Sequence, residues 1–505
     1  MRGQNREIAR VTVELASPLA IGSGAWDDLV DSPFALDASG LPTIPGTSLA
    51  GVLRAAWQRC QTKDIPSAQD VFGFQKRAQN GQADGKASCV EISFAAIHGA
   101  DDRPVGPRLS AAEIAADPLL RLAQLPVVRP HVRLNHLGAA DATERGLFDR
   151  SQVAAGHRFT FEIAVVDSKP EVLDRLLGLL AAGEVRLGGR GRSGLGELRL
   201  KRVLRRRFDL QKKNDFDDFC GLPVDLHEPV GDELLPTVPE EELQDLAGLV
   251  QPGRGAVTAT LTVSPRGFWL VGGGRPADDP AGGKPPDILP YREPCVVWGR
   301  GEAGRETGSL RLDSPELVVP ASALRGALRH RMAFHANRLA NPGCWADDVK
   351  DPTKLRDHDG LRHVHVCALF GEAVAHGTGG NPDRGRPGRV WVDDVRPVPQ
   401  DSTRIPHVAL DRFTGGPIDG ALFEEEALWR GAAWEVRIRI EPPPSGEAEA
   451  PPEARRALGQ AIADLAAARL QIGSGSGRGN GWLEGKVEWS DGGKWASGKG
   501  VADEP

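Results

Sequence analysis

The feature that most constrains this chain is an internal repeat. The block IPGTSLAGVLR begins at Ile44, and VPASALRGALR begins 275 residues later at Val319. HVRLNH and HVALDR lie 276 residues apart, and a Leu-Phe pair follows each of them. RFTFEIAV and WEVRIRI match next, and the glycine-rich LGGRGRSGLGEL and IGSGSGRGNGWL match last. Chance similarity between Gly- and Leu-rich segments is the alternative, but one order at nearly one spacing indicates a duplicated domain.

The repeat sets the expected domain organisation. We predict a first domain over 1–207 and a second over 255–489, which suits a chain of 505 residues. The segment 208–254 between them is rich in proline and acidic residues with weak periodicity, which is typical of a linker. A flexible tail is expected over 490–505.

Each copy carries the same order of predicted elements. It opens with a strand of alternating β-branched residues and continues with a helix after the proline block. Two further strands, a second helix, a glycine-rich loop and a last strand follow. The order β-α-β-β-α-β predicts an α+β fold built of two tandem ferredoxin-like, RRM-like units. Such a sheet leaves one face free, on which proteins often bind single-stranded RNA.

Composition sets the cellular setting and a limit on partners. A net charge of −7 weighs slightly against nucleic acid, but arginines concentrate between Arg186 and Arg207, and local charge matters more. The six cysteines are scattered without a CxxC pair, which favours a reducing cytoplasmic location. No apolar stretch approaches the roughly 20 residues of a membrane helix, so we expect no membrane partner.

The glycine-rich loops lie between a helix and a strand, whereas a phosphate-binding loop of a nucleotide fold lies between a strand and a helix. Their exposed N–H groups and arginines suit phosphate oxygens of an RNA backbone, although a tight turn is the alternative function. The basic run from Lys201 to Arg207 is supporting evidence only. The predicted RNA contacts in these loops are Gly188, Gly189, Arg190, Arg192, Gly475, Gly477 and Arg478.

These blocks together resemble the RAMP superfamily, the repeat-associated proteins of CRISPR systems. The PGTSLAGVLR block from Pro45 resembles the first-helix motif of that family, and the glycine-rich loops resemble its hallmark loop. The regions from Asn135 to Phe148 and from Asp411 to Phe423 resemble the thumb hairpins of type III backbone subunits. The resemblance covers most of the chain except linker, insertions and tail.

The resemblance implies a function and partners. It implies a guide CRISPR RNA bound across each unit, thumbs that wedge the duplex of guide and target RNA, and stacking against other RAMP-family and large subunits of the complex. Two fused copies would occupy two successive positions in that filament. Further RNA-binding residues implied by the matched blocks are Gly22, Gly24, Ser48, Arg54, Arg133, Asn135, Arg329 and Arg412.

The resemblance also implies a catalytic acid. Backbone subunits of this family cut target RNA with an Asp in a loop after the first strand, and VDSP from Val30 places Asp31 there. A carboxylate can act as the base for a ribose 2′-OH or hold a divalent ion, with magnesium the expected one. A turn-forming Asp before Ser-Pro is the alternative function, and Asp27 and Asp28 are weaker candidates.

The second copy departs from this pattern. Tyr291-Arg-Glu-Pro stands where VDSP is expected, and Asp313 lies seven residues before its proline against fourteen for Asp31. We therefore expect the second copy to bind RNA without cutting. Cleavage by a displaced acid is the alternative, for which Asp313 is disfavoured. A non-catalytic scaffold is a second hypothesis for the whole chain. A guide-processing nuclease using His131 or His136 is a third.

A zinc site is the remaining metal hypothesis. Its ligands would be His363, His365 and Cys367, with Cys344. The HxHxC spacing fits no standard ligand loop, and on an extended strand positions two apart share a face. Packing in a core is therefore favoured over zinc.

Overall fold

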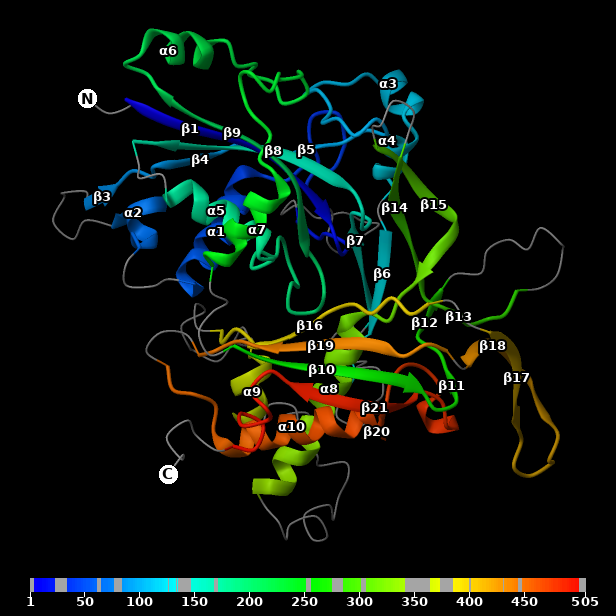
Figure 1. Cartoon of the computed structure of the whole chain (residues 1–505). Coiled ribbons are helices and arrows are strands. Elements are labelled where there is room, and N and C mark those ends of the chain that lie inside the picture. The colour runs from blue at the N-terminus through cyan, green and yellow to red at the C-terminus, as the bar shows by residue number, and fades with distance from the viewer. Residues whose placement is uncertain are drawn as a thin grey trace.

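The computed structural model describes most of the chain and places its two copies one above the other (Figure 1). The described residues are 4–22, 34–60, 65–76, 84–125, 127–132, 134, 147–167, 171–250, 256–274, 285–300, 306–340, 364–372, 385–398, 401–429, 431–443 and 447–498. Within these ranges, no helix has the length and apolar character needed to cross a membrane.

The first half is built on an antiparallel sheet in the order β4-β8-β1-β9, with β5 also paired to β8. Its strands are β1 (Asn5–Leu15), β4 (Val90–Ile92), β5 (Ala96–Ile97), β8 (Arg158–Val166) and β9 (Leu198–Asp209). Its helices are α1 (Gly46–Arg59), α2 (Ala68–Phe72), α3 (Ala111–Ala116), α4 (Pro118–Ala123) and α5 (Glu171–Ala181), and β2 (Phe74–Lys76) pairs with β3 (Asp84–Lys86).

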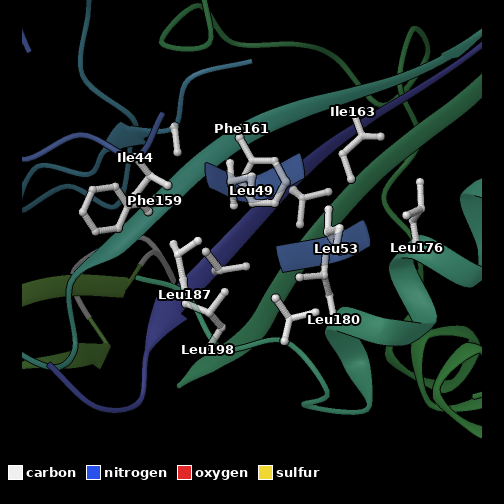
Figure 2. Packing of buried hydrophobic residues seen from close by; sticks show 14 of the residues in the cluster. Ile44, Leu49, Leu53, Phe159, Phe161, Ile163, Leu176, Leu180, Leu187 and Leu198 are labelled. Carbon is white, nitrogen blue, oxygen red and sulfur yellow. The ribbon is translucent and has the colours of Figure 1, made fainter. Parts of the chain in front are cut away.

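Alternation along the strands places the core on one face of this sheet. Figure 2 shows Leu49 and Leu53 of α1 and Leu176 and Leu180 of α5 facing strand residues such as Phe161. All five are fully or almost fully buried, which is the expected result of period-two and helical apolar patterns meeting.

The second half repeats this arrangement in the order β16-β19-β10-β21-β20. Its strands are β10 (Val257–Pro265), β16 (Val390–Val392), β19 (Trp434–Ile440), β20 (Ala467–Gln471) and β21 (Trp482–Trp489). Its helices are α8 (Ala321–Ala340), α9 (Val364–Phe370) and α10 (Pro452–Ala466). The chain is thus an α+β protein with one main buried core in each half, as the repeat predicted, and a smaller buried cluster in the first half.

Each half also carries a long hairpin. In the first half β6 (Val127–Val132) pairs with β7 (Leu147–Gln152), and in the second β17 (Ser402–Leu410) pairs with β18 (Pro417–Trp429). Figure 1 shows β17 and β18 projecting to one side and β6 and β7 between the halves. The second half adds β11 (Phe268–Trp269), β12 (Gly272–Gly274), β13 (Leu289–Pro290), β14 (Arg292–Arg300) and β15 (Glu306–Leu317).

The other face of the first sheet is covered, so the expectation of a free face is wrong for this copy. Arg10 donates to the carbonyl of Pro223, and Phe208 and Leu235 are fully buried. Arg158 forms an ion pair of 2.5 Å with Glu306 of the β14–β15 hairpin. Two segments from outside the sheet, around Pro223 and Glu306, pack against this face, and no pattern within the strands predicts them.

The segment predicted as a linker supplies part of that cover. It carries α6 (Lys213–Cys220) and α7 (Glu240–Gly248), and Leu246 and Val250 join the first core. Part of the predicted flexible tail also has a fixed place, since Trp495 is buried and stacks on Trp489 at 6.3 Å. Apolar side chains in both segments explain why they are held, while the domain limits themselves stay a prediction.

Candidate nucleic-acid interface

The two glycine-rich loops have the same backbone. Each has four left-handed positions, and these recur at one offset of 285 residues. They are Gly188, Arg190, Gly194 and Gly196 in the first loop and Gly473, Gly475, Gly479 and Gly481 in the second. At Gly196 and Gly481 a Cβ atom would overlap the carbonyl of Leu187 or Ile472, so only glycine fits. The loops are therefore a duplicated structure as well as a duplicated sequence.

Each loop holds the chain that follows the first strand of its half. The amide of Gly189 donates to the Ala20 carbonyl at 2.8 Å, and the amide of Ser474 donates to the Leu270 carbonyl at 2.6 Å. The exposed Gly22 lies two residues beyond Ala20, so the first loop is next to the segment that leads to Asp31. Asp31 and Gly24 themselves lie outside the described residues.

An arginine of each loop lies over a hairpin phenylalanine. Phe148 stacks on His131 across the strand pair at 5.2 Å, and the Arg190 guanidinium lies 5.4 Å from the same ring. In the second half, His407 and Phe423 stack at 4.9 Å, and Arg478 lies 5.7 Å from Phe423. The recurring His and Leu-Phe blocks pointed to these rings, but only the strand register brings them together.

The first of these clusters is surrounded by arginines. Burial, and then Arg150, lowers the pKa of Arg190 to about 10, and no carboxylate among the described residues pairs with Arg190. Burial and the cations Arg190, Arg129 and Arg150 lower the pKa of His131 to about 3, so its ring is neutral. An arginine with no acidic partner is suited to an anion such as a phosphate.

The positive charge continues across the joint between the halves. Arg192 lies over Trp391 of β16 at 5.1 Å, and its buried Nε has no hydrogen-bond partner among the described residues. Burial, and then Arg329, Arg192 and Arg190, lowers the pKa of Arg325 on α8 to about 10. These four arginines are called the arginine seam below. Sequence reasoning found three of them and missed Arg325, which lies one helical turn before Arg329.

The remaining predicted contacts are spread more widely. Ser48 and Arg54 are half-buried on α1, and the exposed Arg412 lies at the tip of the β17–β18 hairpin. Gly477 is exposed with open space around its Cα. Arg133 and Asn135 lie outside the described residues.

The basic run on β9 does not add to this surface. Arg205 pairs with Asp174 at 2.6 Å, Arg206 with Asp218 at 2.6 Å, and Arg207 with Glu7 at 3.3 Å. These three cations are paired with acids on neighbouring elements, which leaves less of the run's charge free for RNA than the sequence suggests.

Glu293 lies in the segment that stands in the second half where VDSP is expected, and it forms a buried ion pair. Arg129 of β6 contacts Glu293 of β14 through two hydrogen bonds of 2.7 and 2.8 Å, and Asp394 at 2.9 Å. The hydroxyl of Tyr291 donates to Glu293 at 2.5 Å. Burial alone lowers the pKa of Arg129, but Asp394 and Glu293 outweigh it and raise the net value. Asp313 lies within β15.

The argument that favoured core packing over zinc assumed a strand, and that assumption is wrong. His365 and Cys367 lie on α9, where positions two apart point to different sides, and Cys367 is buried in the protein interior. His363 and Cys344 lie outside the described residues.

The structure is thus a tandem protein of two α+β halves, with a glycine-rich loop in each and an arginine seam where they meet. A family model described as the RAMP superfamily matches residues 12–199 and 264–484, one region in each copy and well over half of the chain. The chain therefore belongs to the RAMP superfamily, and the two regions agree with a tandem fusion. No curated protein matches it. This membership supports a CRISPR-associated, RNA-binding subunit.

Proposed function

We propose that the chain is a double backbone subunit of a type III CRISPR effector complex. It binds the guide CRISPR RNA along both copies and cleaves target RNA through the first copy. The observation that carries this proposal is the duplicated glycine-rich loop, which adjoins the arginine seam in the first copy. Its location is the cytoplasm, with other RAMP-family and large subunits as partners.

Each half is, in this proposal, a ferredoxin-like unit. Counted by chain position, the strand order of the first sheet is second, third, first, fourth, with all neighbours antiparallel. The second sheet follows the same order with β20 added at its edge. The helix between the first and second strands and the helix between the third and fourth support the same unit.

The guide is bound mainly through phosphates. Backbone N–H groups of a glycine loop and the guanidinium groups of Arg190 and Arg192 recognise phosphate oxygens without regard to base. Arg325 and Arg329 extend the positive path into the second half, so one strand can pass from copy to copy. Such binding suits a subunit that must hold any guide sequence.

Cleavage is assigned to Asp31. The first glycine loop binds the described chain at Ala20, eleven residues before Asp31 in the sequence, which supports a role of both in one site. Asp31 acts as the base for the 2′-OH or as a ligand of a divalent ion, magnesium in this proposal. The ion would polarise the scissile phosphate, and its remaining ligands are not assigned.

The test uses the assembled complex with its guide and a matched target RNA. Asp31→Ala is expected to abolish the regular target fragments while leaving target binding unchanged, because one carboxylate is lost from a loop. Asp28→Ala is the matched control in the same loop and is expected to cut normally. Unchanged fragments from Asp31→Ala would replace this proposal with the scaffold hypothesis.

Guide processing is disfavoured by the environment of His131. Its side chain is 8% exposed and stacked on Phe148, which leaves little room for a scissile phosphate. His136 lies outside the described residues. We expect the isolated protein to leave a precursor CRISPR RNA intact in a gel assay.

A further inference from the structure

The arginine of the second glycine loop is held by a buried acid. Glu425 of β18 is fully buried, and its Oε2 lies 2.7 Å from Nη2 of Arg478. Its Oε1 accepts from Asn480 at 3.2 Å and lies 3.0 Å from Nε2 of His407. Burial alone raises the pKa of Glu425, but hydrogen bonds from His407 and Arg478 outweigh it and lower the net value. The carboxylate is therefore ionised and compensates the loop.

The first copy has the opposite charge at the matching position. Phe148 and Phe423 each pair across the hairpin with a stacked histidine, and the residues two further along the strand are Arg150 and Glu425. Arg150 lies 5.5 Å from the Phe148 ring, on the cluster that includes Arg190. One copy thus places a cation beside its loop arginine where the other places an anion.

This difference changes what each loop can bind. A phosphate that reaches Arg190 meets a guanidinium for which the described residues supply no paired carboxylate, with the Arg150 guanidinium over the same ring. A phosphate that reaches Arg478 finds its Nη2 already bonded to Glu425 and meets the negative charge of this buried carboxylate, although the arginine side chain is 43% exposed. Like charges close together repel, and a buried carboxylate is poorly screened by solvent, so the second loop binds a phosphate less readily than the first.

We propose that Glu425 weakens phosphate binding at the second glycine-rich loop, so that the tandem protein holds RNA more tightly at the first loop and the arginine seam than at the second loop. This inference rests on the proposed RNA-binding function and adds that the two loops are not equivalent.

The experiment measures binding of the full chain to a fluorescein-labelled single-stranded RNA over a range of salt concentrations. Glu425→Gln keeps the shape of the side chain but removes its charge, which frees Arg478. We expect its affinity to rise several-fold and the salt slope to steepen by about 0.7, the value for one additional phosphate contact. Glu425→Gln/Arg478→Gln is expected to lose this gain.

A control separates this effect from a change in net charge. Glu453→Gln removes one exposed carboxylate from α10 and is expected to alter the salt slope little. Circular dichroism must show that the variants are folded. If Glu425→Gln behaves as Glu453→Gln while the wild type binds RNA, the inference is overturned and the proposed function stands. If the wild type has no salt-sensitive affinity for RNA, both are overturned.

Discussion

Arg129 and Glu293 join the two copies through a bidentate ion pair in which both side chains are almost fully buried. Arg129 lies on β6 in the hairpin of the first half, and Glu293 lies on β14 in the second half. Asp394 is a second acidic partner of Arg129. It also accepts a hydrogen bond of 2.7 Å from the backbone amide of Ala321, at the start of α8. The joint is therefore a fixed contact, which sets where the first glycine loop meets the second half.

Arg129→Met is expected to destabilise the folded chain strongly. It leaves Glu293 and Asp394 buried without their cation, which costs about 3–5 kcal/mol when one partner of a buried pair is removed. The measurement is the free energy of unfolding from chemical denaturation. The control Arg437→Met breaks an exposed pair with Glu435 and should change stability by less than about 1 kcal/mol. Equal small effects of the two substitutions would contradict the structural role of Arg129.

Gly196→Ala and Gly481→Ala are expected to lower stability by similar amounts. Each places a side chain at a left-handed position and against a backbone carbonyl, so we expect a loss of at least about 1–2 kcal/mol. Gly477→Ala is the matched control within a glycine loop, because no heavy atom lies within 4 Å of its Cβ position. Thermal unfolding measures all three. A tolerated alanine at Gly196 or Gly481 would rule out the shared loop backbone.

Acid is expected to weaken the fold through His157. This residue is 2% exposed, and burial lowers the pKa of its ring to about 4, with Asp117 opposing the shift. The unfolded chain takes up the proton near pH 6.5, so stability is full above that pH and falls as the pH drops toward 4. From about pH 7.5 to about pH 5.5 the loss is about 1 kcal/mol. His157→Gln should lose less over this range, and an identical pH dependence in both proteins would refute the assignment.

The fold was more predictable than the contacts between its parts. The alternation in β1 and β10 and the apolar faces of α1 and α5 are local patterns, so the order of elements in each half follows from sequence. The cover over Arg10 and Arg158 is different, because it comes from segments more than a hundred residues away. No periodicity in a strand indicates which distant segment will cover it.

The sequence indicates which loops and arginines form the site, but it does not indicate which of those arginines are paired with an acid. The glycine loops and three of the seam arginines stand out in the sequence, and their left-handed backbone agrees with the glycines found there. The compensation of Arg478 by Glu425 and of Arg205 by Asp174 depends on which acids fold against which arginines. An arginine count alone therefore overestimates the surface that is free for RNA.

The central claim is that the first glycine loop holds an RNA backbone through Arg190. The most direct test is the affinity of the full chain for a labelled single-stranded RNA as a function of salt, compared with Arg190→Gln and with the exposed Arg456→Gln as control. We predict that the affinity falls steeply with salt in the wild type and the control, and that Arg190→Gln binds several-fold more weakly with a slope flatter by about 0.7. No salt-sensitive affinity in the wild type, or equal binding by all three proteins, would contradict the account.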